Sequence, residues 1–161
     1  MRIAVISDTH LPRRGRALPL RLIEECRAAD LILHAGDLVD LSVLEDLERL
    51  GPVHAVCGNC DGDALARALP ARTVVPAGGV RIGMIHDAGV RDGRGRRLRR
   101  LFPDADVVVF GHSHQPLIER HEDLLLVNPG SATDRRREPV CTMARMTVTA
   151  ADVAVELIDL A

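Results

Sequence analysis

Short apolar runs alternate with amphipathic segments along the first half of the chain. The runs with the length and β-branched content of buried strands are residues 2–6, 31–33 and 53–56. Each run is followed by a segment with helical periodicity or composition, at residues 18–28, 42–50 and 63–69. Ser42, with Glu45 three residues later, is the expected N-terminal cap of the second helix. This alternation of strand and helix predicts a parallel sheet covered by helices.

The second half of the chain is richer in strands. One basic helix is expected over residues 95–102, and a turn over residues 76–79. We predict strands at residues 72–75, 80–85, 106–110, 116–120, 124–127, 141–147 and 153–158. This pattern predicts a second, more antiparallel sheet. Because we find no internal repeat and no long polar linker, we predict one α/β domain over residues 1–161.

Composition limits the classes of partner. The chain has 161 residues, of which 47% are hydrophobic, so it can bury a full core. Its net charge of −2 gives no global attraction to nucleic acid or to an anionic membrane, and its only aromatic residues are two phenylalanines. We therefore expect no specific nucleic-acid binding and no membrane partner. Four cysteines and the lack of a signal-like apolar segment favour a cytoplasmic protein without structural disulfides.

Metal-ligating side chains recur at the ends of five predicted strands. Imidazole, carboxylate and amide oxygen together suit a transition metal such as Mn, Fe or Zn. Ligands of α/β proteins bind at the carboxyl ends of parallel strands, so these loops can converge. The pair of histidines in Gly-His-Ser-His, directly after a buried strand, is the strongest single signal. The candidates are Asp8, His10, Asp37, Asn59, His86, His112 and His114.

Taken in this order, the motifs resemble those of the calcineurin-like metallophosphoesterases. The motifs are Asp8-x-His10, Gly36-Asp37, Gly58-Asn59-Cys60-Asp61, His86 and Gly111-His112-Ser113-His114. The resemblance runs from residue 1 to about residue 131, and it is strongest to the small bacterial and archaeal phosphodiesterase branch. It implies a four-layer α/β/β/α sandwich, in which two mixed sheets are flanked by helices.

The resemblance also implies roles for the candidates and two divalent ions, with Mn expected and Fe, Ni or Zn as alternatives. Asp8, His10 and His114 would bind one ion; Asn59, His86 and His112 would bind the other; Asp37 would bridge them. The implied reaction is in-line attack on the phosphorus of a small phosphate ester by a metal-bridging hydroxide. The residues expected to be catalytic are Asp37, Asn59 and His86, with the Asn59 amide group free to contact phosphate.

Two positions depart from the pattern of many relatives. Cys60 stands where many have a histidine that is thought to assist the leaving group, although the closest branch also carries this cysteine. A thiol with a pKa of about 8.5 is a poor general acid, so we expect diesters with good leaving groups to react best. Asp87 stands where relatives often have glycine, and it is expected to tune the rim of the site or to repel anionic substrates.

Three other functions remain open at this point. Cys57 and Cys60 form a Cys-x-x-Cys pair between a strand and a helix, as in thioredoxin-like redox proteins. A catalytically weak metal-binding scaffold or interaction subunit is the second, because the family includes a trafficking-complex subunit of this fold. A DNA-repair nuclease of the same superfamily is the third, but those chains are longer and carry the histidine.

Further residues are assigned to support. His34 and Asp61 are candidates for orienting the ligands, although His34 fits a buried backbone cap equally well. Residues 128–131, Asn-Pro-Gly-Ser, read as a turn that supports the site. The arginines of residues 91–100 read as a solvated helix face, with substrate attraction or a homo-oligomer contact as the alternative.

Overall fold

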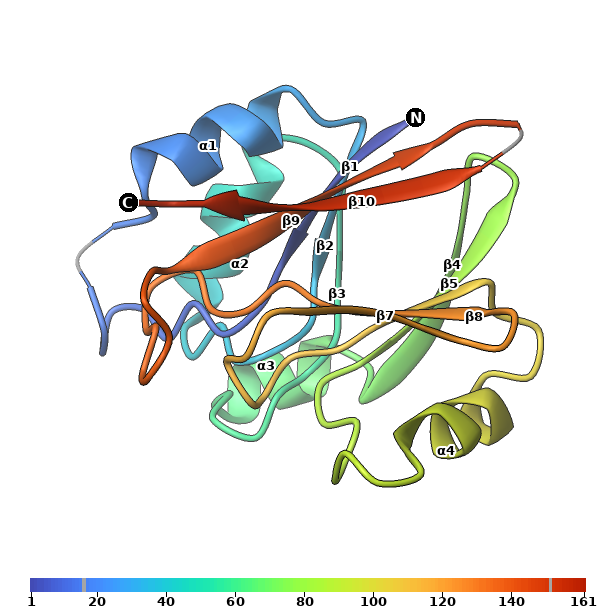
Figure 1. Ribbon diagram of the computed structural model, residues 1–161. Helices are drawn as coiled ribbons and strands as arrows, with labels where there is room; N and C mark the ends of the chain where they lie inside the picture. Colours follow the sequence, from blue (N-terminus) through green and yellow to red (C-terminus); the bar gives the residue numbers. More distant parts are fainter. Residues whose placement is uncertain (16, 151) are drawn as a thin grey trace.

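A computed structural model describes residues 1–15, 17–150 and 152–161. In it, two five-stranded sheets face each other, and helices cover their outer faces (Figure 1). The first sheet has the order β10 (Val153–Asp159), β9 (Thr142–Val148), β1 (Arg2–Ile6), β2 (Leu31–His34) and β3 (Val53–Ala55). The second has the order β4 (Arg72–Ala77), β5 (Val80–Ile85), β6 (Val107–Val109), β8 (Leu124–Asn128) and β7 (Leu117–His121). The helices are α1 (Leu20–Arg27), α2 (Leu41–Glu48), α3 (Asp63–Ala68) and α4 (Arg94–Leu101).

Both sheets are mixed, as the family resemblance implied, whereas the pattern of the first half alone predicted a purely parallel sheet. Strands β1, β2 and β3 are parallel, and so are β5, β6 and β8, whereas β4 and β7 are antiparallel edge strands. The strand-rich second half was predicted to form a second, more antiparallel sheet, but its last two strands do not join that sheet. The hairpin β9–β10 returns to the first sheet, where β9 pairs antiparallel with β1. This return makes the first sheet mixed.

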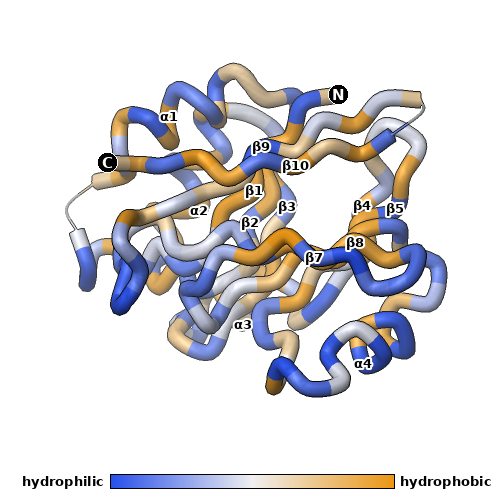
Figure 2. Tube along the Cα trace, viewed as in Figure 1, coloured by the Kyte–Doolittle hydropathy of each residue, from blue (hydrophilic) through white to orange (hydrophobic). Residues whose placement is uncertain are grey.

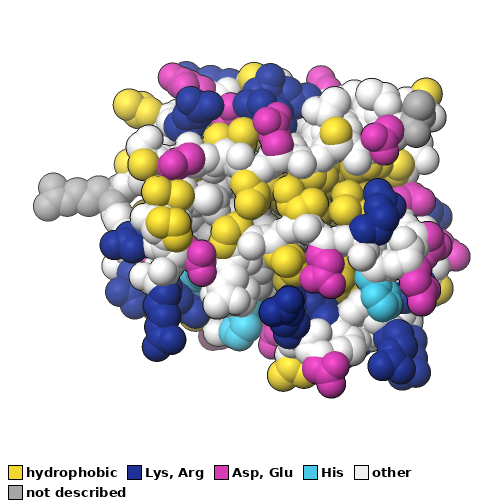
Figure 3. All heavy atoms as spheres, in the orientation of Figure 1, with side chains coloured by type: hydrophobic (Ala, Val, Ile, Leu, Met, Phe, Trp, Pro, Cys, Tyr) yellow, Lys and Arg dark blue, Asp and Glu magenta, His cyan; other side chains and the backbone are white. Residues whose placement is uncertain are grey.

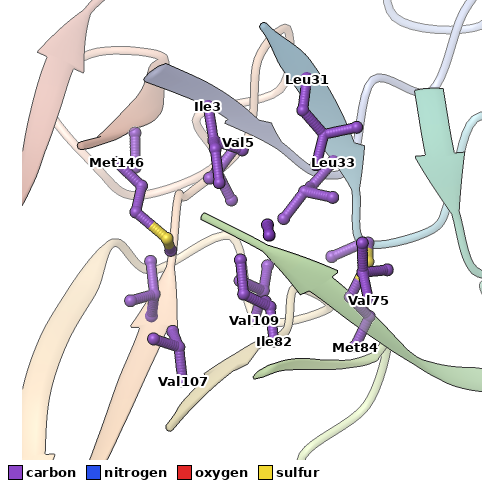
Figure 4. Packing of buried hydrophobic residues seen from close by; sticks show 14 of the residues in the cluster. Ile3, Val5, Leu31, Leu33, Val75, Ile82, Met84, Val107, Val109 and Met146 are labelled. Carbon is purple, nitrogen blue, oxygen red and sulfur yellow. The ribbon is translucent and has the colours of Figure 1, made fainter. Parts of the chain in front are cut away.

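Three layers of apolar packing confirm the four-layer sandwich. Ile3 and Val5 of β1 point between the sheets, where they meet residues such as Ile82 and Val109 (Figure 4). Ala4 and Ile6 point to the other face, against α1, α2 and α3. A third cluster packs α4 on the outer face of the second sheet. Because both faces of the central strands are buried, their sequences are continuously apolar. In Figure 2, stretches coloured orange for hydrophobic residues run along strands in the interior of the molecule.

Most predicted element ends differ from the structure by one or two residues, and two of the differences have a clear physical cause. Helix α2 begins at Leu41, and Asp40 is its cap: the Asp40 carboxylate accepts a hydrogen bond of 2.9 Å from the Ser42 amide. The expected Ser42 cap is wrong. Because the Asp40 side chain accepts from the Ser42 amide, Ser42 lies inside the first turn of the helix and Asp40 precedes it as the cap. Strand β4 also continues through Pro76 to Ala77. Proline has no backbone N–H to donate to a neighbouring strand, and an edge strand tolerates this because only one of its sides is paired.

In the described part of the chain, no helix is both long enough and apolar enough to cross a bilayer.

A charged cluster ties α1 to two strands of the first sheet. The buried Glu25 carboxylate accepts hydrogen bonds from Arg145 of β9, at 2.5 and 3.0 Å, and from Arg2 of β1, at 2.7 Å. These contacts, led by those of Arg145, hold the pKa of Glu25 below its ordinary value. The cluster joins segments that lie 120 residues apart in the sequence.

We predict that Glu25→Gln lowers the free energy of unfolding by about 1–2 kcal/mol at pH 7, because two guanidinium groups lose their anionic partner. The folded-state pKa is lowered, so this contribution is present above the ordinary value of 4.5 and is lost as the pH falls through the folded-state pKa. Urea denaturation between pH 7 and pH 3 measures it. Glu45→Gln, which removes an exposed carboxylate on α2, is the control. A difference between wild type and Glu25→Gln that stays constant over this range would contradict the prediction.

Candidate metal centre

The loops that follow five strands bring the seven candidate residues together. Asp8 and His10 follow β1, Asp37 follows β2 and Asn59 follows β3. His86 directly follows β5 of the second sheet, and His112 and His114 follow β6. The centre therefore takes residues from both sheets, at the carboxyl ends of their parallel strands.

Asp8, His10 and His114 form one group. The Nε2 atoms of the two histidines lie 3.2 Å apart, and Asp8 Oδ1 lies 3.3 Å from that of His114 and 3.6 Å from that of His10. Asp8 Oδ1 is buried and has no hydrogen-bond partner among the described residues. A buried carboxylate oxygen without a donor is costly, and a cation would satisfy it. The donor set of this group therefore fits a metal ion.

Asn59, His86 and His112 form the second group. Asn59 Oδ1 lies 3.0 Å from His86 Nε2 and 2.8 Å from His112 Nδ1. The two rings meet edge to face, with their centroids 5.2 Å apart. The group combines two ring nitrogens with one amide oxygen, which are ligands that Mn, Fe and Zn share.

Asp37 lies between the two groups. Its Oδ2 is 3.6 Å from His10 Nε2 and 3.4 Å from His86 Nε2. Its other oxygen accepts a hydrogen bond of 2.7 Å from the Cys60 amide, which fixes the orientation of the carboxylate. One carboxylate thus faces a histidine of each group.

Both acidic side chains are held in their charged form. Burial alone would raise the pKa of Asp8, but the nearby His10 and His114 rings and the hydrogen bond from Ser7 outweigh burial and hold the pKa far below its ordinary value. Burial also opposes ionisation of Asp37, yet His86 and the Cys60 amide lower its pKa to about 2. Ionised carboxylates are the form that binds cations.

Backbone carbonyls select which ring nitrogen faces the centre. His86 Nδ1 donates to the Ala35 carbonyl at 2.7 Å, and His114 Nδ1 donates to the Asp134 carbonyl at 2.5 Å. Each bond uses the proton on Nδ1, so Nε2 is the ring nitrogen that faces the carboxylates and is placed to bind a metal ion.

The backbone of these loops is in an uncommon conformation. Five of the seven candidates have φ between 45° and 67°, a region in which non-glycine residues are strained: Asp8, His10, Asp37, His112 and His114. Side chains from the residue 128–131 turn brace them. Ser131 donates to the Asp8 carbonyl at 2.7 Å, and Asn128 donates to the Gly111 carbonyl at 2.9 Å. These contacts agree with the supporting role expected for this turn.

Asp61 and His34 each brace two loops. Asp61 accepts hydrogen bonds from the amides of Asp37 and Gly58, at 3.1 and 2.7 Å, and from that of Val39 at 2.7 Å. His34 is fully buried, and burial lowers its pKa to about 3, so the ring is neutral. It accepts from the Gly36 amide at 3.2 Å and lies 3.2 Å from the Thr9 hydroxyl. Asp61 thus positions the backbone of Asp37, whereas His34 fixes the backbone beside Asp37 and Asp8.

Three supporting residues were missed by the sequence analysis. Ser7 donates to Asp8 Oδ2 at 2.6 Å, Thr133 donates to the Thr9 carbonyl, and Asp134 supplies the carbonyl that accepts from His114. Ser7 stands next to a candidate ligand, which is a weak signal. Thr133 and Asp134 act from a distant segment, and no local pattern marks them.

Gly58 and Gly111 are required by close packing at the centre. A Cβ atom on Gly58 would overlap with the Asp37 carboxylate and its amide, and one on Gly111 would overlap with the side chains of Ser7 and Asp8. A Cβ on Gly62, four residues after Gly58, would meet only the Val39 carbonyl at 3.9 Å. The glycines thus let the backbone approach the carboxylates.

We predict that Gly58→Ala lowers the free energy of unfolding by about 1–3 kcal/mol and weakens metal binding at the candidate centre, because Asp37 must move. Gly62→Ala is the matched control and should stay within about 0.5 kcal/mol of wild type. Urea denaturation and elemental analysis after Mn saturation measure both effects. Equal behaviour of the two variants would show that Asp37 has room to move.

The pKa values of the cysteine pair argue against a redox site. Cys57 and Cys60 are free thiols, and burial together with the nearby Asp37 and Asp61 carboxylates raises the pKa of both. Redox cysteines depend on a lowered pKa, which makes the thiolate available. The raised pKa of Cys60 also weakens it as a proton donor.

The arginines of residues 91–100 lie on and before α4, which covers the outer face of the second sheet. Arg97 donates to the carbonyls of Ala88 and Val90, and Arg99 donates to that of Ala105 and pairs with Asp123 at 2.8 Å. Arg97 and Arg99 therefore hold the ends of the helix in place, whereas the sequence predicted only a solvent-exposed helix face for this run.

Comparison with known proteins places this centre in a family. Residues 1–151 match the calcineurin-like phosphoesterase superfamily domain, and the chain belongs to this superfamily. A protein of Methanothermobacter thermautotrophicus named a probable metallophosphoesterase is 42% identical over 135 residues, which cover 83% of this chain and 78% of that protein. Family, relatives and donor geometry together support a metal-dependent phosphoesterase.

Two solved structures share the fold. A structure described as a novel archaeal phosphodiesterase has a TM-score of 0.75 and 23% identity, covering 98% of this chain and all of the other. Vps29 from Entamoeba histolytica, solved in complex with Zn²⁺, has a TM-score of 0.78 and 23% identity, and the match covers 100% of each chain. At this identity the two structures establish the fold alone.

Proposed function

We propose that the protein is a phosphodiesterase that uses two divalent cations, held by the seven residues of the candidate centre. The observation that carries the proposal is the position of Asp37, whose Oδ2 lies within 3.6 Å of a histidine nitrogen in each of the two groups. A carboxylate in this place can join two ions. The bound substrate would be a small phosphate ester.

The two groups assign the ligands. Asp8, His10 and His114 would hold one ion, with the unpartnered Oδ1 of Asp8 as the anionic ligand. Asn59, His86 and His112 would hold the other, and Asp37 would contact both. Mn is the proposed metal because the donors mix nitrogen and oxygen; Fe, Ni and Zn accept the same set. The Zn²⁺ of the Entamoeba Vps29 structure supports the last of these.

When bound, the ions would supply a water of lowered pKa and neutralise charge on the phosphoryl oxygens. The chain's own residues do the rest. His86 and His114 are oriented by carbonyls behind them, and Asp37 by the Cys60 amide. Asn59 directs its oxygen to the histidines, which leaves its NH₂ group, 3.4 Å from Cys60 Sγ, to donate to a phosphoryl oxygen.

Leaving-group assistance is the weak point of this centre. Cys60 lies beside Asn59, and its thiol pKa is raised by burial and by Asp37. A poor acid at this position favours diesters whose leaving groups depart without a proton. We therefore propose diester hydrolysis with preference for acidic leaving groups.

A scaffold of the same fold is the second candidate, because structures of Vps29, a protein whose full name is vacuolar protein sorting 29, share the architecture over nearly their whole length. The complete set of seven donors at short mutual distances favours the enzyme instead. Metal-loaded protein without diesterase activity would favour the scaffold.

We predict two Mn ions per chain after saturation, and a melting temperature about 5–10 °C higher than that of chelated protein, because the ions bind only the folded state. Asp37→Ala should reduce the Mn content and lower diesterase kcat/KM by more than about 100-fold. This exceeds the loss typical of a residue that only hydrogen-bonds to a metal ligand. His10→Ala, which leaves the shared carboxylate in place, should lose less activity. Elemental analysis, thermal unfolding and hydrolysis of bis(p-nitrophenyl) phosphate are the measurements.

Retained activity with no bound metal would end the two-ion proposal. Wild-type activity in Asp37→Ala would refute the role given to Asp37.

A series of aryl phosphodiesters tests Cys60. Wild-type activity should depend steeply on leaving-group pKa, and Cys60→Ser should keep it within about threefold, because the thiol delivers little proton. Cys60→His should raise activity on poor leaving groups by about tenfold or more if its ring reaches the leaving oxygen. If wild-type activity does not depend on leaving-group pKa, and Cys60→Ser loses activity, the thiol acts as the acid. Disulfide reductase activity that requires both Cys57 and Cys60 would instead support a redox enzyme.

A further inference from the structure

A cavity opens beside the candidate metal centre. It has a volume of about 350 Å³ and is lined by Ser113, His114 and Gln115 on one side and by residues 135–138 on the other. His114 belongs both to this cavity and to the first group of candidate ligands. A molecule bound at the centre would therefore lie next to the cavity.

Three consecutive arginines line this cavity. Arg135, Arg136 and Arg137 are exposed, and within the described ranges none of them forms an ion pair with a carboxylate. Arg135 donates to the Glu138 carbonyl at 2.7 Å, which closes the turn. The side chains of Arg136 and Arg137 have no hydrogen-bond partner among the described residues. Glu138 adds one carboxylate to the lining, so the cavity keeps a surplus of two positive charges.

The arginine loop is held in place relative to the metal centre. The Asp134 carbonyl accepts from His114, and the Asp134 amide donates to Ser131 at 2.9 Å. The Asp134 carboxylate accepts from the Arg136 amide at 3.3 Å and pairs with Arg14, also at 3.3 Å. Arg136 itself has a φ of 48°, which non-glycine residues adopt only when their surroundings hold them. In Figure 3, basic side chains gather at the lower left, over the loops that follow β1 and β8 in Figure 1.

A second cavity, next to the other group of candidate ligands, has different chemistry. A cavity of about 430 Å³ is lined there by Ala71, Ile85 and Asp87, next to His86 and His112. Asp87 is exposed and brings a negative charge, and the remaining wall is partly apolar. A phosphodiester lying across the centre would thus meet cations at one arm and an apolar, acidic wall at the other.

We infer that the arginine cavity binds a second phosphate group of the substrate, so that the enzyme selects diesters with one phosphorylated and one uncharged arm. Guanidinium groups match phosphate geometry and bind it through paired hydrogen bonds. The uncharged arm lies on the Ile85 side, because Asp87 repels a second anion there. This inference rests on the proposed phosphodiesterase function and names its substrate class.

Two substrates that differ by one phosphate test it. Thymidine 5′-(p-nitrophenyl phosphate) and its 3′-phosphorylated form share the same scissile ester. For Mn-loaded wild type, kcat/KM should be at least about fivefold higher for the 3′-phosphorylated ester, mainly through a lower KM. The preference should shrink as ionic strength rises. Arg136→Gln/Arg137→Gln should abolish it, with activity on the unphosphorylated ester kept within about twofold.

Arg96→Gln/Arg100→Gln is the matched control. It removes the same charge from two exposed arginines of the α4 region, which have no ion pair in the described part of the chain. It should keep the preference of wild type. Equal kcat/KM for both esters in wild type, or equal loss of the preference in both double variants, would overturn the inference.

A binding measurement separates this inference from the proposed function. If Mn-loaded protein hydrolyses neither ester, the proposed phosphodiesterase function is wrong. Titration calorimetry with thymidine 3′,5′-bisphosphate and thymidine 5′-monophosphate then tests phosphate binding in the arginine cavity without depending on hydrolysis. Tighter binding of the bisphosphate, lost only in Arg136→Gln/Arg137→Gln, supports a phosphate site. Equal affinities for the two nucleotides contradict it.

Discussion

Two ionised carboxylates buried at the ends of neighbouring strands are the constraint on which this structure depends. Asp8 and Asp37 follow the paired strands β1 and β2, and both are shielded from water. A buried charge without partners costs several kcal/mol, so the surrounding residues must supply donors or cations. Ser7 and the His112 amide donate to Asp8, the Cys60 amide donates to Asp37, and one oxygen of Asp8 remains for a cation.

The rest of the fold serves to keep these donors in place. Continuous apolar strands, packed on both faces, give the loops fixed starting points. Because five of the candidate ligands have a strained backbone, separate side chains must hold it: Asp61 holds the loop of Asp37, and Ser131 and Asn128 hold the loops of Asp8 and His112. The centre is therefore positioned by hydrogen bonds from outside the ligand set.

The sequence predicted what depends on local pattern. Strand ends with Asp, Asn and His marked the seven candidates, because the geometry of parallel strands brings their carboxyl ends together. It did not predict that β9 and β10 join the first sheet, since the choice of sheet depends on contacts with β1 far away in the chain. Asp40 as the cap of α2 was missed because two capping residues compete there. The contacts of Thr133 and Asp134, and the cavity beside His114, arise only once distant loops meet.

The pairing of β9 with β1 also bears on the time at which the centre forms during synthesis. Strand β1 pairs on one side with β2, which leaves the ribosome soon after it, and on the other with β9, which ends at Val148. The braces on the Asp8 loop likewise come from Ser131 and Thr133. Domains generally fold as units, and pairings between distant segments wait for the later one. The nascent chain therefore carries Asp8 and His10 without a finished pocket until β9 has emerged, and a metal ion at the proposed centre would bind only after the β9–β10 hairpin has been made.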